Sequence, residues 1–190
     1  MKAKLNIVFK KMLENVERNL ERFVEGKPVV LTSESFSEVY IKNSNITTCK
    51  EHNESFSEFR RIKNRPVLYW FSIDDEITNA TILRSKYLEF KDLKSLRNSA
   101  ACKPYLDINS KTLYVGKVKK DFHLRLVTHL GYSRNKDTAG MQIYHWYKPN
   151  EFGNLTLNYI VFEEEMKDLI AMLEIEFARE LKPIIGKYTL

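Results

Sequence analysis

The feature that most constrains the fold is a dense apolar and aromatic run from Pro66 to Ile73, PVLYWFSI. A run of this length, rich in branched and aromatic side chains, is typical of a buried strand. Similar runs predict further strands at Phe36–Ile41, Thr112–Val118, Met141–Lys148 and Asn154–Phe162. The chain therefore has the material for a small sheet.

Helical periodicity separates these runs. Leu5, Val8, Met12, Val16, Leu20 and Val24 recur at steps of three and four, which predicts an amphipathic helix over residues 5–24 that Gly26 and Pro28 end. Further helices are predicted at 55–62, where Ser55 and Glu58 fit a capping box, at 79–97, at 121–130 with Gly131 as its cap, and at 164–182.

Together these elements predict an α+β fold with an N-terminal helical extension. The division falls at residues 1–64 for the extension and 65–190 for the α+β domain. The chain of 190 residues is long enough for one domain of about 150 residues with an extension. Its 43% hydrophobic and 29% charged residues are typical of a globular protein.

Several classes of protein are not supported by the sequence. No stretch approaches the roughly 18 apolar residues that a membrane-spanning helix needs. The run Leu5–Phe9 is interrupted by Lys10 and Lys11, so it is too short for a signal-peptide core. Cys49 and Cys102 have no paired spacing that would suggest a zinc site or a disulfide framework. We therefore expect a cytoplasmic protein that does not associate with membranes.

The positive charge is concentrated in one window, from Lys111 to Lys136. Only Asp121 opposes its seven basic residues, so this window alone matches the formal net charge of +6; the basic residues are Lys111, Lys117, Lys119, Lys120, Arg125, Arg134 and Lys136. A local basic patch is expected of a surface that binds phosphates, but a solvated lysine-rich face has the same composition. Charge alone leaves both interpretations open.

Three motifs follow one another in the second domain. The first is PVLYW, with Tyr69 on a predicted strand. The second is LYVGKV, with Tyr114, followed on the next helix by Arg125 and His129. The third is LEIEFARELKP, with Glu174 nine positions before Pro183. In this order, over residues 66–186, they resemble the GIY-YIG nuclease family.

The resemblance implies a small antiparallel sheet flanked by helices and a metal-dependent endonuclease that hydrolyses nucleic acid, with DNA as the expected substrate. It implies Mg²⁺, or Mn²⁺, as the cofactor, with Glu174 as the metal ligand. The implied catalytic residues are Tyr69, Tyr114, Arg125, His129 and Glu174. The basic window is then expected to form the nucleic-acid face, with contacts from Lys117, Lys119, Lys120, Arg134 and Lys136. Which tyrosine is the base, and whether His129 shares that task, stays open. Lys117 would either lower a tyrosine pKa or hold phosphate.

The chain also departs from the family pattern. Val67 and Leu68 replace the glycine and isoleucine of the first tripeptide, and Gly186 stands where an asparagine is common. The two tyrosines are 45 positions apart, so an insertion is expected at about residues 74–111.

Each motif residue also has a structural explanation. A tyrosine in an apolar strand is usually a packing residue, and Arg125 and His129 share a helix face as i, i+4 neighbours. Glu174 is expected at the edge of the core stripe formed by Ile170, Leu173, Phe177 and Leu181, and only its spacing to Pro183 selects it over Glu180. His52, His123 and His145 are given no role, and Glu163–Glu165 is first a helix-capping feature.

Two other classes of function therefore remain. One is a nucleic-acid-binding or regulatory module on the same fold with weakened catalysis. The other is a structural protein whose N-terminal helix binds a partner or a second copy. Cleavage that depends on a metal would separate the enzyme from both, and salt-sensitive binding would separate the binding module from the scaffold.

Overall fold

The computed structural model describes residues 2–32, 35, 45–50, 52–73, 79–93, 98–102, 105–133 and 138–187. The elements in chain order, with η for a 3-10 helix, are α1 (Lys2–Arg22), β1 (Val24–Glu25), β2 (Val29–Leu31), α3 (Asn53–Arg61), β3 (Val67–Ile73), α4 (Ala80–Asp92), β4 (Thr112–Val118), α5 (Phe122–Leu130), η2 (Ile143–His145), α6 (Pro149–Phe152), β5 (Leu155–Val161), η3 (Glu164–Lys167) and α7 (Ile170–Leu181). The predicted α+β class and the N-terminal helix are confirmed. None of the helices in these described ranges is both long enough and apolar enough to cross a membrane.

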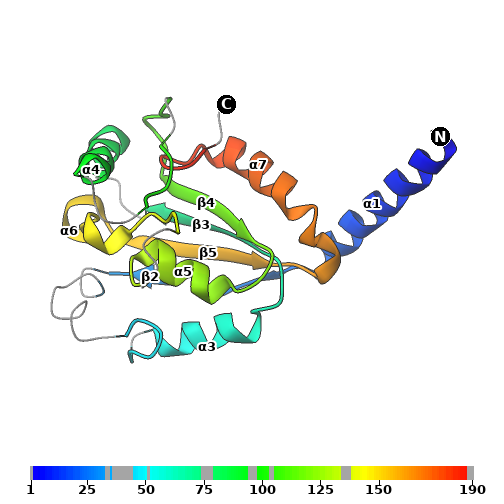
Figure 1. Ribbon diagram of the computed structural model, residues 1–190, viewed down its shortest axis with the longest axis horizontal. Helices are drawn as coiled ribbons and strands as arrows, with labels where there is room; N and C mark the ends of the chain where they lie inside the picture. Colours follow the sequence, from blue (N-terminus) through cyan, green and yellow to red (C-terminus); the bar gives the residue numbers. More distant parts are fainter. Residues whose placement is uncertain are drawn as a thin grey trace.

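One antiparallel sheet organises the molecule (Figure 1). Its order is β1-β5-β3-β4, and β2 also pairs with β5. Strand β3 is central, and its Tyr69 lies opposite Gly116 on β4 and Tyr159 on β5. The strand predicted at Thr112–Val118 is confirmed to the residue, and those predicted at 66–73 and 154–162 are confirmed with ends shifted by one residue.

The two faces of the sheet pack against different helices because successive side chains of a strand alternate. On β3, the face with Val67, Tyr69 and Phe71 belongs to the core with α3 and α5. Leu68 lies on the other face, in a second cluster with α7. Figure 1 shows the same arrangement, with α7 on one side of the sheet and α5 and α3 on the other.

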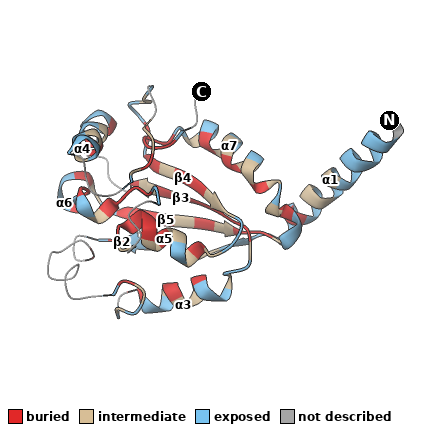
Figure 2. Cartoon of the chain, viewed as in Figure 1, coloured by how far each residue is buried: buried red, intermediate tan, exposed pale blue. Residues whose placement is uncertain are grey.

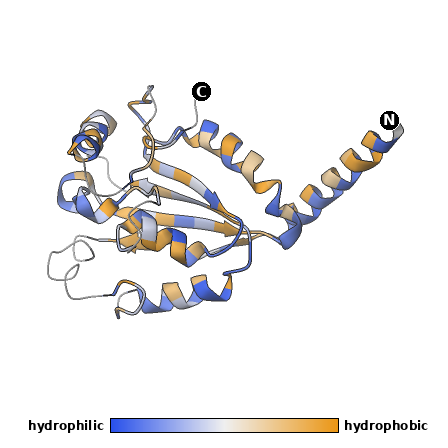
Figure 3. Cartoon of the chain, in the orientation of Figure 1, coloured by the Kyte–Doolittle hydropathy of each residue, from blue (hydrophilic) through white to orange (hydrophobic). Residues whose placement is uncertain are grey.

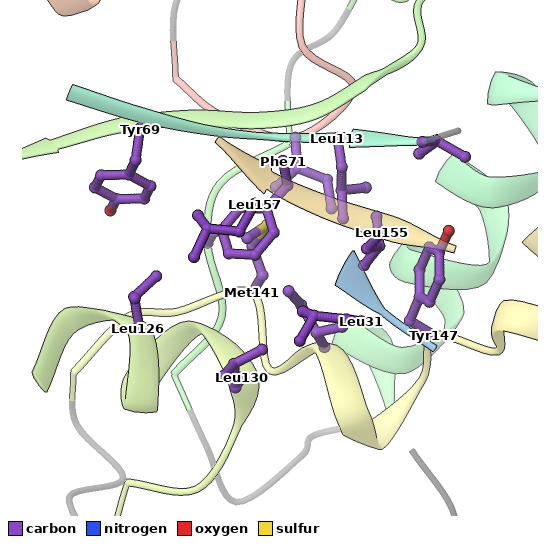
Figure 4. Close-up of a cluster of buried hydrophobic side chains, with 14 of the residues drawn as sticks. Leu31, Tyr69, Phe71, Leu113, Leu126, Leu130, Met141, Tyr147, Leu155 and Leu157 are labelled. Atoms are coloured by element: carbon purple, nitrogen blue, oxygen red, sulfur yellow. The ribbon is translucent and has the colours of Figure 1, made fainter. Parts of the chain in front are cut away.

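The larger core lies between the sheet and α5. Leu126 and Leu130 point from α5 toward the strands, where Tyr69 and Leu157 meet them (Figure 4). Phe59 of α3 makes edge contacts with Phe122 and Tyr159, at ring-centroid distances of 5.1 and 5.3 Å. Burying one such side chain fully contributes about 1.5–3 kcal/mol, so this layer holds α3 and α5 on the sheet.

Elements from both sides of residue 64 share this sheet. Strands β1 and β2 pair with successive parts of β5, so the first 64 residues are not only a helical extension. Strands β1 and β2 were not predicted because each has only two or three residues, too few to show a period.

Helix α1 is attached at its carboxyl end, where the side chain of Asn19, 1% exposed, accepts a hydrogen bond from the Glu163 backbone N–H at 3.0 Å. The rest of α1 is mostly exposed (Figure 2).

The strand predicted at Met141–Lys148 is wrong. Gln142 has a φ of 55°, which no strand accommodates, and η2 follows it. The Trp146 Nε1–H donates to the Met141 carbonyl at 2.8 Å and closes a compact turn. The run is apolar because Met141, Ile143, Trp146 and Tyr147 are buried by this turn, which periodicity cannot distinguish from a short strand.

Two helix predictions also need correction. Residues 164–182 form η3 and then α7, since a turn at Asp168–Leu169 separates them while Met166 and Ile170 are both buried. Helix α3 begins at Asn53 with His52 as its N-cap, so Ser55 lies inside the helix and the capping box is absent.

The ends of two further predicted helices follow local signals. Helix α4 begins after Asn79, whose side chain accepts from the N–H groups of Thr81 and Ile82, and α5 ends at Gly131 as predicted. Residues 36–41, where a strand is predicted, lie outside the described residues.

Gly26, in the connection between β1 and β2, is the basis of a testable prediction. The Gly26 N–H donates to the Tyr159 carbonyl at 3.0 Å, and a Cβ at Gly26 would overlap the Tyr159 ring. That ring is held between Phe59 and Phe122. Gly26→Ala should therefore lower the free energy of unfolding by about 1–3 kcal/mol, measured by urea denaturation.

The control is Lys27→Ala at the neighbouring exposed position, which should change stability by less than about 0.5 kcal/mol. Equal stability for the two variants would show that the Gly26 backbone does not pack on Tyr159.

Candidate functional site

Four of the predicted site residues come together between the sheet and α5. Tyr69 and Tyr114 lie on neighbouring strands, with ring centroids 6.3 Å apart. His129 packs against both rings, at 5.7 and 4.7 Å. Arg125 lies one turn earlier on the same helix; its Nε–H donates to the Tyr69 hydroxyl oxygen at 3.4 Å, and its charge acts on both tyrosines.

Gly116 makes this approach of two tyrosines possible. It lies opposite Tyr69 on β4, and a Cβ there would come within 2.6 Å of the Tyr69 Oη and of the Tyr114 ring. Real side chains do not tolerate such contacts. A glycine at the end of the second tripeptide is therefore required by packing alone.

The buried hydrogen bonds determine which nitrogen of His129 carries the proton. The Met141 backbone N–H donates to Nδ1 at 3.3 Å, so Nδ1 is an acceptor and the neutral ring carries its hydrogen on Nε2. That Nε2–H donates to the Tyr69 hydroxyl oxygen at 2.9 Å. The Arg125 Nε–H donates to the same oxygen at 3.4 Å. Tyr69 thus orients both His129 and Arg125.

Burial is the main effect on the pKa values in this cluster. Burial, followed by the charge of Arg125, lowers the pKa of His129 well below its ordinary value of 6.5. Burial raises the pKa of Tyr69 and of Tyr114, and Arg125 only partly offsets this. Both hydroxyls are therefore protonated at neutral pH.

The expectation that Lys117 lowers a tyrosine pKa is not supported. Lys117 follows Gly116 directly and lies opposite Leu68. Because successive side chains of a strand alternate, its side chain is on the α7 face of the sheet, away from the two tyrosines. The cation that acts on both tyrosines is Arg125.

A cavity of about 190 Å³ opens at the edge of the sheet beside β4. Tyr114, Arg125 and Glu174 supply functional groups to it; its other lining residues are Ala100, Ala101, Val115, Ala139, Gly186 and Lys187. Helix α7 packs on the face opposite α5, yet Glu174 reaches the same cavity because β4 is the last strand. Three elements thus converge around one strand edge.

The segment after α7 forms one wall of this cavity. The N–H groups of Ile184 and Ile185 donate to the Thr112 and Leu113 carbonyls, both at 2.9 Å. The Gly186 N–H donates to the Ala101 carbonyl, also at 2.9 Å. The segment predicted as an insertion therefore contributes directly to the cavity, through Ala100 and Ala101.

Glu174 is more buried than its predicted position at the edge of the core stripe implies. It is 7% exposed and lies in the row of Ile170 and Ala178, the most buried line of α7. Leu173 and Phe177, expected at the core, are only half-buried, and Glu180 is exposed. The stripe was misplaced because α7 has two apolar flanks, one toward the sheet and one toward α1.

The expectation that all five residues line one concave site is correct for three. Tyr69 and His129 are both 0% exposed and lie behind Tyr114 and Arg125. Lys187 lines the cavity and was not predicted, since it lies far from the basic window in the sequence. Its position beside Gly186, already noted as a family departure, was the one signal that could have suggested it.

The predicted nucleic-acid contacts are more scattered. Lys119 is paired with Asp168, with an Nζ–Oδ1 distance of 2.7 Å. Lys120 is exposed at the turn before α5, and Lys117 is half-buried on the α7 side. Arg134 and Lys136 lie outside the described residues.

The carboxylate chemistry of the cavity suits one kind of metal ion. In the described part of the chain, no group of three or more His, Cys, Asp or Glu side chains could enclose an ion. Zinc sites need such a set, whereas Mg²⁺ retains several waters and binds through one or two carboxylates and substrate phosphate. Glu174 beside a cavity that Tyr114 and Arg125 also line fits the second arrangement.

Comparison with models of protein families, with curated proteins and with solved structures gives no match for this chain.

The buried His129 predicts how stability depends on pH. The folded pKa is lowered, so below pH 6.5 the unfolded chain takes up a proton that the folded chain does not. The contribution of His129 to stability is therefore complete above pH 6.5 and is lost as the pH falls, by up to about 1.4 kcal/mol per pH unit. Urea denaturation at several pH values measures this slope.

His129→Gln is the matched variant, because it removes the titrating group and keeps a polar side chain. Its slope below pH 6.5 should be smaller than that of the parent chain. Identical slopes would mean that His129 is not the buried neutral group described above.

Proposed function

We propose that this chain is a metal-dependent endonuclease that hydrolyses phosphodiester bonds in nucleic acid, with DNA as the first substrate to test. The observation that carries the proposal is the cavity beside β4. It combines the phenol of Tyr114 on β4, the guanidinium of Arg125 on α5 and the carboxylate of Glu174 on α7. These three elements are distant in the sequence. Hydrolysis of a phosphodiester needs charge neutralisation, a positioned water and a site for a cation.

Arg125 is the proposed phosphate-binding group. Its Nη1–H donates to the Ala139 carbonyl at 2.8 Å, and its Nε–H donates to Tyr69. These two bonds fix the plane of the guanidinium. The N–H groups that remain can bind two phosphate oxygens, as a planar fork does better than an ammonium.

Tyr114 is the proposed tyrosine that contacts the reacting atoms. Tyr114 lines the cavity, whereas Tyr69 is fully buried behind it. A protonated phenol can accept a hydrogen bond from the attacking water and orient it toward phosphorus. Tyr69 is then a positioning residue, because its oxygen holds Arg125 and His129.

Glu174 is the proposed metal ligand, with Mg²⁺ or Mn²⁺ as the ion. A cation held there would neutralise charge that develops on the phosphate and the leaving oxygen. The low exposure of Glu174 keeps its carboxylate in place before substrate arrives. Lys187 in the same cavity adds a second positive charge for the nucleic-acid backbone.

A nucleic-acid-binding module with weakened catalysis is the second candidate. The complete burial of Tyr69 and the altered first tripeptide favour it. Cleavage of supercoiled plasmid in Mg²⁺ or Mn²⁺, with a chelator control, separates the two candidates. Salt-sensitive binding without cleavage would support the module.

The first functional prediction concerns Glu174. Glu174→Gln keeps the shape of the side chain and removes its charge, so plasmid cleavage should fall by at least about 10²–10³. Binding measured without metal should hold or rise slightly, because a negative charge near the phosphate is lost. Circular dichroism and thermal denaturation check that the variant is folded.

Glu176→Gln on the same helix is the control, since the Glu176 side chain is exposed and pairs with Arg179 at 2.6 Å. It should cleave at a rate close to that of the parent chain. An inactive Glu176 variant together with an active Glu174 variant would mean that the metal ligand was assigned to the wrong glutamate. Two active variants would refute the proposed metal site.

The second functional prediction distinguishes the two tyrosines. Tyr114→Phe should slow cleavage by about 10²-fold or more and leave stability within about 1 kcal/mol, because Tyr114 is half-buried. Tyr69→Phe should slow cleavage and also lower stability by about 1–3 kcal/mol, because the His129 and Arg125 donors lose a buried acceptor. Cleavage rates and urea denaturation of both variants test this.

The opposite pattern, with stability lost only in Tyr114→Phe, would contradict the assignment of Tyr69 to the buried layer.

A further inference from the structure

An apolar trough runs between α1 and α7, on the face of the sheet away from α5. It consists of two adjoining hollows of about 360 and 550 Å³ that share Val16, Met166, Leu173 and Glu176. Its walls include Phe9 and Leu13 of α1 and Met172 of α7, each 60–62% exposed. The trough is separate from the cavity beside β4, with which it shares no lining residue.

This trough is exposed although the sequence marks its residues as core. Helix α1 continues outward from the molecule, with hydrophobic residues along it (Figure 3). Leu5, Phe9 and Leu13 repeat at every fourth position, and all are at least half exposed. A contiguous exposed apolar surface is typical of a site that binds a partner or a membrane.

The charge of α1 indicates what covers the trough. Residues 2–11 contain four lysines and no acidic residue, whereas residues 12–22 contain Glu14, Glu17 and Glu21. The arginines in that second half are Arg18 and Arg22, and Arg18 already contacts Glu165 at 3.6 Å. Glu176 and Glu180 line the wall formed by α7, where Glu176 also pairs with Arg179 at 2.6 Å.

We propose that the trough is the interface with a second copy of this chain, whose α1 lies antiparallel to the first. In this orientation the lysine-rich half of each helix lies beside the glutamates of the other copy's α1 and α7. A parallel pair would set lysines against lysines. The same surface meets itself across a two-fold axis, the commonest symmetry of soluble dimers.

The packing is consistent with a helix as the occupant. Helix α1 has 21 residues and is about 30 Å long, so two antiparallel copies can overlap along its length, with the lysine-rich half of each beside the second half of the other. The Phe9 and Leu13 side chains of one copy would then enter the hollows beside Leu173 and Phe177 of the other. Leu173 and Phe177 are only half-buried in the single chain.

The test is the mass of the full chain in solution, measured by light scattering and sedimentation over a range of concentrations. The parent chain should have twice the mass of the 22.5 kDa monomer. Phe9→Glu should raise the dimer Kd at least about 30-fold, as expected for loss of a buried aromatic anchor. The exposed position of Phe9 means that folding, followed by circular dichroism, should be unaffected.

Ile7→Glu is the matched control, because Ile7 is 59% exposed but does not line the trough. It lies about 200° around the helix from Phe9, and its dimer should persist. If Phe9→Glu and Ile7→Glu dimerise equally well, the proposed interface is wrong.

Charge reversal tests the orientation. Lys10→Glu with Lys11→Glu should weaken an antiparallel dimer several-fold at low salt, and adding Glu14→Lys with Glu17→Lys in the same chain should restore it. An unchanged dimer in the first variant would overturn the antiparallel arrangement.

Two results would overturn the proposal as a whole. One is a parent chain that stays monomeric up to roughly 100 μM, well above the Kd of a stable homodimer. The other is a monomer that sediments with vesicles of anionic phospholipid through Phe9 and Leu13, since α1 would then be a membrane-surface helix.

Discussion

The hydroxyl of Tyr69 is the interaction on which the candidate site depends. Tyr69 is on the central strand, completely buried, and its oxygen accepts hydrogen bonds from both His129 and Arg125. His129 is 0% exposed, so losing this acceptor would leave its buried Nε2–H unsatisfied. The bonds attach α5 to β3 and also direct the Arg125 guanidinium toward the cavity. Packing and chemistry are thus served by the same atoms.

The position of β4 at the end of the sheet explains why a single cavity can collect groups from both faces. Side chains that alternate along a strand are normally separated by the sheet, and α5 and α7 do pack on opposite sides (Figure 1). Beyond β4 the described part of the chain has no further full strand, only the short Ile184–Ile185 segment beside Thr112 and Leu113, so groups from the two faces can meet around the strand edge. Tyr114 and Arg125 approach from one side and Glu174 from the other.

The N-terminal helix α1 is held by the rest of the molecule only near one end. Its carboxyl end is held by the buried Asn19 and by packing near η3, while its first half extends away from the sheet (Figure 2). The apolar face of that half is not used within the single chain. The segment between α1 and α3 nevertheless adds β1 and β2 to the sheet, so the N-terminal region is integrated with the fold at one end and exposed at the other.

The sequence alone determined the three long strands, the main helices and the α+β class, because each depends on local periodicity that a window of residues carries. It also selected Tyr114, Arg125 and Glu174, which line the cavity beside β4, although their selection depended on family spacing as much as on chemistry. It did not reveal β1 and β2, which are too short to show a period, nor the turn at Gln142, whose left-handed backbone is imposed by packing.

Only the tertiary structure decided which tyrosine lines the cavity, since Tyr69 and Tyr114 occupy equivalent places in their motifs. It also decided that Glu174 belongs to the buried row of α7 and that Lys187 lies near Arg125. These features depend on distances between residues far apart in the chain, and no local pattern encodes such distances.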